Sequence, residues 1–445
     1  MFKNILNAFK IKDVRTRMLF TLLMVLLVRF GCHVLSPGIN VELLSQWQQA
    51  MSGSTFNFFN VITGSSFSSM SVFALNISPY ITSSIIVQLL TIAIPALEEM
   101  SKDGEEGKKK LNAITRYLTV ALALIQGVSM AIGFGRSYMN NYTWYNVAVI
   151  GIVMTAGATG LMWIGERITE RGIGNGISIL LLVNILSGLP NDFRTLYAAF
   201  VAGHGVTLGI LIAILILALL LALVVFVIYL QDGERRIPVQ YAKKLQGRRM
   251  VGGQSSNIPM KVNTAGVIPV IFASSLLSIP AMIATFAGKD LTVKENEAVG
   301  FGTHVLRTLS QSFWCNPKYP VYTIGLLIYL ALLVVFAYFY TSITFNPSEI
   351  ANNMKKQGGF IPGIRPGKPT SDYMNKILTY IVFIGVTGLA IVAVIPIILT
   401  GIFGVGSSLC FFGTSLIIIV GVILETMKQV ESMMTVRSYK GFLTD

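Results

Sequence analysis

The chain is poor in charge and in residues that perform chemistry. Only 12% of its 445 residues are charged and 53% are hydrophobic, and it contains three cysteines and three histidines. So few cysteines, without a CxxC spacing, provide neither a disulfide framework nor a metal motif, and the scattered histidines form neither a metal cluster nor a triad. This composition is far too apolar for a soluble protein. We therefore expect a membrane protein that is not an enzyme and needs no cofactor.

Carboxylates are absent from the long apolar segments. Ten segments are long enough to cross the roughly 30 Å hydrocarbon layer as helices, and none contains Asp or Glu. The predicted spans are 18–35, 69–97, 117–138, 143–165, 173–190, 206–230, 262–287, 319–343, 374–399 and 403–424. Ion-driven transporters keep ionisable groups at membrane depth, so a secondary transporter is disfavoured. Arg29, near the outer end of the first span, is explained by snorkelling.

Positive charge is concentrated in the loops on one side of these spans. That side holds 27 of the 34 Lys and Arg residues and +12 of the net charge of +14. By the positive-inside rule it is cytoplasmic, and ten spans place both termini there. Two of its loops, 231–261 and 344–376, are longer and more basic than topology requires. The segment before the first span, 1–18, has the pattern of an amphipathic interfacial helix.

Each half of the chain has five spans. An odd number of spans gives the two halves opposite orientations, as in inverted repeats. We expect a boundary near residue 190, with 1–190 and 191–445 as the halves. The second span of each half places a proline shortly before a hydroxyl cluster: Pro79 before Thr82, and Pro269 before Ser274. The same residues are also common in unrelated membrane helices, so this similarity is weak by itself.

The segment 56–69, before the second span, is moderately apolar and rich in Gly and Ser. It is too short to cross the membrane. Irregular backbone at membrane depth must be sheltered by protein or line a cavity, so a plug or re-entrant element is one interpretation. An external surface loop is the other.

Six stretches, in one order along nearly the whole chain, carry a family resemblance. They are Pro79–Leu90, Arg171–Ser178, Glu234–Lys244 with Gln254–Gly266, Phe345–Lys356, Gly359–Gly367 and Gly413–Ile418. Together they resemble the SecY family, the channel subunit of the bacterial protein translocase. The resemblance implies an all-α membrane protein with ten transmembrane helices in two inverted five-helix halves around a central hourglass pore. It also implies a function: translocating unfolded secretory polypeptides and releasing hydrophobic segments laterally into the bacterial cytoplasmic membrane.

The resemblance also assigns roles to residues inside the membrane. A ring of aliphatic side chains at the waist of the pore would comprise Ile77, Ile81, Leu181, Ile185, Ile271 and Ile418. Such a ring could seal around any polypeptide and exclude ions at rest by dewetting. A lateral gate between the second and third spans and the seventh and eighth would include Thr82, Gln126 and Asn263, joined by interhelical hydrogen bonds. The plug would include Phe58, Phe59, Val61, Ile62 and Phe67.

The two long basic loops match the family's docking site for the ribosome and for the SecA motor ATPase. The candidate contacts are Arg235, Arg236, Lys243, Lys244, Arg248, Arg249, Lys355, Lys356 and Arg365. Lys and Arg attract the phosphates of ribosomal RNA strongly and in a salt-sensitive way. By the same resemblance, the small subunits SecE and SecG, signal-bearing preproteins and membrane lipids are further partners. An accessory export paralogue remains an alternative, although the long basic loops favour the housekeeping channel.

Overall fold

The computed structural model describes residues 9–44, 63–64, 66–139, 142–198, 206–241, 244–246, 249–251, 255–286, 300–315, 319–403 and 410–440. Within these residues each predicted span overlaps a helix, although the bounds differ. The ten helices are α2 (Lys12–Gly31), α5 (Ser78–Ala93), α7 (Gly104–Tyr138), α8 (Trp144–Arg171), α9 (Gly176–Leu196), α10 (Val206–Asp232), α11 (Ile268–Phe286), α13 (Ile324–Thr344), α15 (Lys368–Phe403) and α16 (Cys410–Lys440). Seven are long and apolar enough to cross a membrane alone, and an eighth span counts if α5 is joined with the short helix that follows it.

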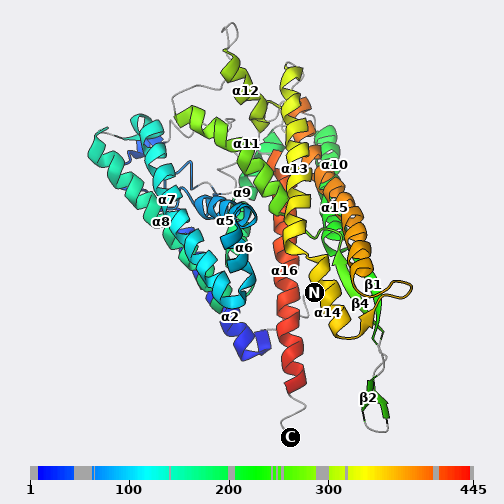
Figure 1. Ribbon diagram of the computed structural model, residues 1–445. Helices are drawn as coiled ribbons and strands as arrows, with labels where there is room; N and C mark the ends of the chain where they lie inside the picture. Colours follow the sequence, from blue (N-terminus) through cyan, green and yellow to red (C-terminus); the bar gives the residue numbers. More distant parts are fainter. Residues whose placement is uncertain are drawn as a thin grey trace.

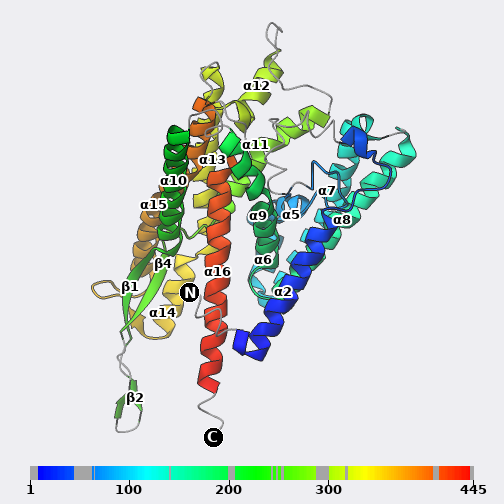
Figure 2. The ribbon, with the colours of Figure 1, turned by 180° about the vertical axis from the view of Figure 1, so that it is seen from behind.

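The helices form two groups that meet along α9 and α16. In Figures 1 and 2, α2, α7 and α8 lie side by side, and α10, α13, α15 and α16 form a second bundle. Between the groups, α9 packs against both α8 and α16, and α7 packs against α11. The start of α2 and the end of α16 lie at the same end of the molecule (Figure 1).

Small residues allow the first group to pack closely. A Cβ atom at Gly127 of α7 would lie only 3.0 Å from the carbonyl oxygen of Gly151 in α8. One at Gly157 of α8 would collide with the backbone of Val72, in the segment before α5. Close backbone approach at small residues is typical of helix association in membranes, where van der Waals packing replaces the hydrophobic effect.

The second predicted span has different bounds in the structure. The prediction was 69–97, but residues 72–77 form turns and α5 begins only at Ser78. At its other end, α5 stops at Ala93, and α6 (Pro95–Lys102) leaves at an angle of 108°. Pro95 causes this break, because proline disfavours a helical conformation at the preceding residue, and Ile94 is accordingly extended. Hydropathy alone could not locate either boundary.

A small sheet, which the sequence did not predict, joins the two basic loops. Strand β1 (Glu234–Tyr241) pairs antiparallel with β4 (Ser255–Lys261) from Glu234 to Gln240, and with β5 (Gly359–Phe360) at its end. The hairpin β2 (Lys244–Gln246) and β3 (Arg249–Val251) extends from the same loop, and α14 (Pro347–Lys356) precedes β5.

A short cap lies at the opposite end of the molecule, formed by α12 (Phe301–Leu309), η2 (Gln311–Phe313) and η3 (Pro320–Thr323) (Figure 1). Trp314 anchors it by donating its indole N–H to the carbonyl oxygen of Thr308 at 2.7 Å. Burial raises the pKa of the neighbouring Cys315 thiol.

Candidate functional site

The predicted pore residues converge in the centre of the molecule. Five of them, Ile77, Ile81, Ile185, Ile271 and Ile418, belong to one hydrophobic cluster. Ile77 and Ile185 are only 1% and 2% exposed, and Ile418 is 5% exposed. Leu181 is also buried, although it lies outside this cluster.

The cluster draws on both halves of the chain. Ile77 is the N-cap of α5 and Ile185 lies in α9, whereas Ile271 and Ile418 lie in α11 and α16. Isoleucines in membrane helices usually face lipid or pack against a single neighbour. Here they meet from four helices, and their shared surface is purely aliphatic. Such a surface can exclude water and ions without offering a hydrogen bond.

The segment before α5 is sheltered by protein where the structure describes it. Thr63, Gly64, Ser66 and Phe67 are all buried, and Phe67 packs in a cluster with residues of α7 and α8. This part is therefore not an exposed surface loop. Phe58, Phe59, Val61 and Ile62, also assigned to the plug, lie outside the described residues.

Two buried asparagines connect this segment to the pore helices, and sequence reasoning did not single them out. Asn76 donates a side-chain N–H to the carbonyl oxygen of Thr63 at 3.2 Å. Its Oδ1 accepts hydrogen bonds from the amide of Ile77 at 2.8 Å and from Nδ2 of Asn184 at 3.1 Å. The signal that could have found them is the rarity of a carboxamide inside a strongly apolar segment, since buried polar groups need partners.

The same segment also contacts α2. Nη1 of Arg29 donates to the carbonyl oxygen of Gly64 at 3.5 Å. Arg29 is half-buried, so it does more than snorkel towards the membrane surface as the sequence suggested. Gly64 has a φ of +62°, and a Cβ atom there would lie 2.8 Å from both Arg29 Nη1 and Ser187 Oγ.

Two of the three predicted gate residues, Thr82 and Asn263, make local hydrogen bonds rather than bonds across helices. Thr82 donates its hydroxyl to the carbonyl oxygen of Ser78, one turn earlier in α5, at 3.0 Å. Asn263 donates to the carbonyl oxygen of Gly266 at 3.0 Å. Among the described residues, neither bonds to the other or to Gln126, so the expected interhelical hydrogen bonds are not formed here. Short-range acceptors compete successfully, because threonine can bond the carbonyl of residue i−4 in its own helix.

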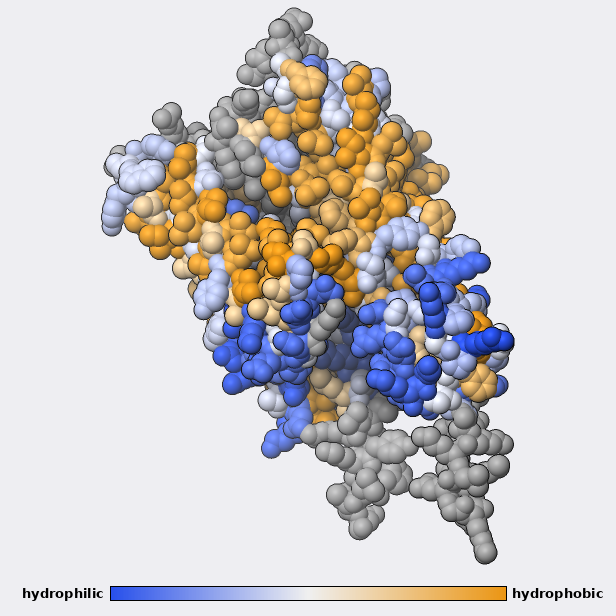
Figure 3. Space-filling model, in the orientation of Figure 1, coloured by the Kyte–Doolittle hydropathy of each residue, from blue (hydrophilic) through white to orange (hydrophobic). Residues whose placement is uncertain are grey.

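The basic residues gather on one end of the molecule. Arg235 and Arg236 of β1, Lys355 and Lys356 at the end of α14, and Arg365 are all exposed. Figure 3 shows hydrophilic side chains concentrated at this end, below a broad apolar band. Lys244 and Arg249 lie in the β2–β3 hairpin, whereas Lys243 and Arg248 fall outside the described residues.

The tip that carries Arg365 has a defined conformation. Gly363 and Gly367 flank it with φ values of +83° and +104°, which glycine adopts without strain. The hydroxyl of Thr370 donates to the carbonyl oxygen of Arg365 at 2.8 Å and fastens the tip to the start of α15. The guanidinium is thereby presented to solvent on a short, fixed turn.

The glycine-rich turn between α8 and α9 has a structural role. Gly174, with a φ of +78°, donates its amide to Oε1 of Gln429 in α16 at 2.5 Å. The amide of Ile173 donates to Oγ1 of Thr21 in α2. Asn175 caps α9 by accepting from the amides of Ile177 and Ser178. No phosphate-binding role is needed to explain these glycines.

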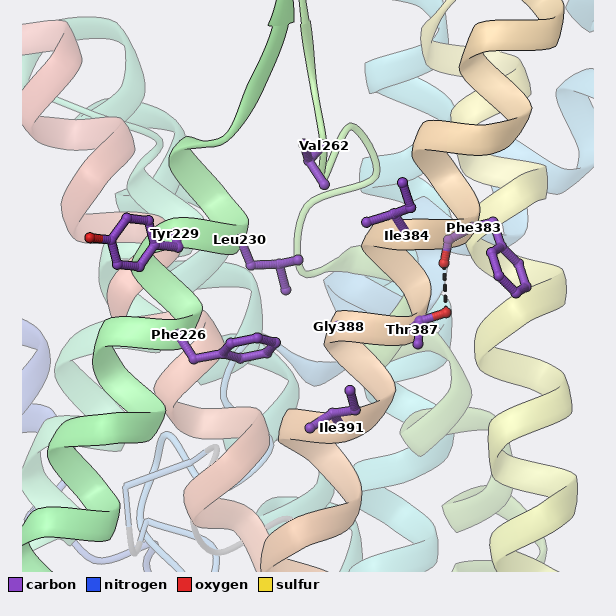
Figure 4. A pocket seen from close by; sticks show the side chains of 9 residues that line it. All are labelled: Phe226, Tyr229, Leu230, Val262, Phe383, Ile384, Thr387, Gly388 and Ile391. Carbon is purple, nitrogen blue, oxygen red and sulfur yellow. Dashed lines mark hydrogen bonds between the residues drawn. The ribbon is translucent and has the colours of Figure 1, made fainter.

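A shallow groove between α10 and α15 is almost entirely apolar (Figure 4). Its volume is about 460 Å³, and it is lined by Phe226, Tyr229, Leu230, Val262, Phe383, Ile384, Thr387, Gly388 and Ile391. The hydroxyl of Thr387 is occupied by the carbonyl oxygen of Phe383 at 2.8 Å. The hydroxyl of Tyr229 points away from the groove (Figure 4), so the lining is poor in polar groups that could recognise a substrate. Within the described residues no cluster of His, Cys, Asp and Glu could hold a metal.

A multi-helix membrane protein with a buried hydrophobic cluster at its centre and a basic face has the features of a membrane channel. The SecY family model matches residues 71–427. The protein translocase subunit SecY of Halalkalibacterium halodurans is 42% identical over 449 residues, covering 100% of both chains. The chain belongs to the SecY family.

Solved structures show the same fold. A structure described as a protein-conducting channel matches with a TM-score of 0.62 at 17% identity, covering 94% of this chain and 92% of the other. Sec61 from a canine ribosome–channel complex matches with a TM-score of 0.61 at 15% identity and the same coverage. The fold is the ten-helix membrane architecture of two inverted halves around a central pore, and the family is one of channel subunits, not of enzymes.

Proposed function

We propose that this protein conducts unfolded secretory polypeptides across the bacterial cytoplasmic membrane and releases hydrophobic segments sideways into the lipid. The observation that carries the proposal is that aliphatic side chains from α5, α9, α11 and α16 meet in one hydrophobic cluster. An extended polypeptide could displace these side chains without exchanging hydrogen bonds with them. That property suits a channel whose substrates share no sequence.

In this proposal Ile77, Ile81, Leu181, Ile185, Ile271 and Ile418 form the resting seal. The segment around Phe67 would lie on the external side of that seal, and the other residues assigned to the plug fall outside the described residues. Support comes from the burial of Ile77, Leu181, Ile185 and Ile418, from the partial burial of the other two, and from the burial of the described end of the segment. Opening would require both the ring to widen and the segment to move aside.

The lateral exit would lie between α5 and α7 on one side and α11 and α13 on the other. The contact of α7 with α11 supports this assignment, because it brings together one helix from each proposed side of the exit. Thr82, Gln126 and Asn263 remain the proposed gate residues. Their lack of mutual hydrogen bonds makes parting of the two sides less costly than the sequence suggested.

The basic end would dock the ribosome or the SecA motor, since the chain has no nucleotide-binding motif of its own. One structural relative is a ribosome-bound channel, and the exposed arginines and lysines of both loops suit contacts with phosphate. SecE and SecG would complete the assembly. Both termini would be cytoplasmic, and residues 1–190 and 191–445 would be the two halves that part.

The test is transport by the full chain, purified with the small subunits that accompany it and reconstituted into lipid vesicles. With SecA and ATP, we expect an unfolded, signal-bearing preprotein to become protected from external protease, and a folded one to stay accessible. Uptake of a small solute without preprotein import would identify a transporter and overturn the proposal.

A further inference from the structure

We infer that Asn76 and Asn184 are positioning residues that couple the plug segment to the pore constriction. This inference rests on the channel function proposed above. Each asparagine directly precedes a ring residue, Ile77 in one case and Ile185 in the other. Their amide–amide hydrogen bond therefore joins the N-terminus of α5 to the middle of α9 at the level of the seal.

The pair is fully enclosed. Asn76 is 1% exposed and Asn184 is 0% exposed, and the Thr63 carbonyl that accepts from Asn76 belongs to a residue that is 1% exposed. In this setting a donor that loses its acceptor cannot be compensated by water, and leaving it unpaired is costly. The closed arrangement supplies both acceptors.

Two movements would each break one of these two hydrogen bonds. Departure of the plug segment would remove the Thr63 carbonyl from Asn76. Separation of α5 from α9, which widens the constriction, would break the bond between the two amides. Both bonds involve the side chain of Asn76. When either movement breaks one bond, that side chain is held less firmly in the orientation that the other bond requires. The plug and the ring would thus open together rather than independently.

The geometry also keeps the hydrogen-bond network of Asn76 and Asn184 weak. Oδ1 of Asn184 is buried and accepts no hydrogen bond from the described residues. A network with one unsatisfied acceptor stabilises the closed state less than a complete one would. Tight contact at Gly64, against Arg29, Ser187 and the carbonyl oxygen of Asn184, keeps the segment close to α9.

The backbone of Asn76 permits a clean variant. Its φ of +50° is left-handed, a conformation that asparagine tolerates and glycine adopts freely. Asn76→Gly therefore removes the carboxamide without straining the turn. Asn184→Ala removes the other partner, and Asn375→Ala, at an exposed position of α15, controls for loss of a carboxamide elsewhere.

The experiment measures resting ion conductance of the reconstituted full-length complex in planar bilayers. We expect Asn184→Ala to raise it about fivefold, the factor that corresponds to loss of one net hydrogen bond. Asn76→Gly also removes the bond to the Thr63 carbonyl and should raise the conductance further. The double variant should resemble the more severe single variant, because the two residues act through one bond. Asn375→Ala should match the wild type.

A second readout does not depend on current. In a background with the native cysteines replaced by serine, Thr63→Cys should react slowly with an external membrane-impermeant maleimide. Reaction should accelerate about fivefold when Asn184→Ala is added. Unchanged conductance and labelling in both single variants, or fully multiplicative effects in the double variant, would overturn the coupling. A wild-type complex that neither imports preprotein nor opens would instead overturn the channel function.

Discussion

Gln240 of β1 pairs with Phe360 of β5, which lies 120 residues later in the chain. This pairing makes the two basic loops parts of one sheet rather than two independent projections. Arg235 and Arg236 lie in the same strand, β1, and β5 leads directly into the turn that presents Arg365. The proposed docking face would therefore respond as a unit when a partner binds any part of it.

Reversing the charge of Arg365 should weaken binding of the ribosome or SecA. We expect Arg365→Glu to lower affinity for the ribosome or SecA by about tenfold, because like-charge contact replaces a favourable one. Affinity is measured by co-sedimentation with the reconstituted complex over a range of salt concentrations, and import is measured in parallel. Lys110→Glu makes the same charge change at an exposed position of α7 and should bind normally. Equal binding by Arg365→Glu and the wild type would remove this residue from the interface.

The sheet itself can be tested without changing charge. A Cβ atom at Gly359 would lie 2.9 Å from the ring of Tyr241, so Gly359→Val should force β5 away from β1. Overpacking of this kind typically costs about 1–3 kcal/mol. We expect weaker ribosome binding although every arginine and lysine remains, together with faster proteolysis of the loop containing β5. Gln357→Val, at an exposed position two residues earlier, is the control. Normal binding by Gly359→Val would show that the loops act separately.

The seal depends on the aliphatic character of the constriction. Ile185→Ser and Ile418→Ser should each raise resting ion conductance severalfold, because a polar side chain lets water occupy the narrowest part of the pore. Single-channel recording in planar bilayers measures this directly. Ile152→Ser is the matched control, since Ile152 is 62% exposed on the outer face of α8. Conductance that remains at the wild-type level in both pore variants would refute the ring.

The sequence predicted the helical spans well, because they depend on a strong, simple signal. Long runs without carboxylates have few structural alternatives to membrane helices. The ring residues followed from the family resemblance, since an isoleucine in an apolar helix gives no local indication of the direction it faces. Five of these residues meet in one cluster, and the first and last of them, Ile77 and Ile418, are 341 positions apart in the sequence.

What the sequence did not predict depends on competition between local and distant partners. Residues 72–77 are apolar enough to extend the second span, yet packing against Gly157 holds them as turns. Thr82 could bond across helices, but the carbonyl of Ser78 is closer. Strand β1 carries exposed arginines, and its pairing with β5 depends on a loop more than 100 residues away. Such outcomes require the tertiary structure.

If the pore opens laterally between α5 and α11, a crosslink between these two helices should block transport. In a background where Cys32, Cys315 and Cys410 are serine, Thr82→Cys in α5 and Ser275→Cys in α11 can be joined by a flexible bismaleimide. We expect preprotein import to fall to background after crosslinking, because a hydrophobic signal segment needs α5 and α11 to separate. Protease protection measures import, and gel mobility measures the crosslinked fraction. The control joins Arg116→Cys and Glu166→Cys, whose native side chains form a 2.8 Å ion pair between α7 and α8 on one side of the pore. That crosslink should leave import intact, and the same result for the α5–α11 crosslink would exclude a gate between these helices.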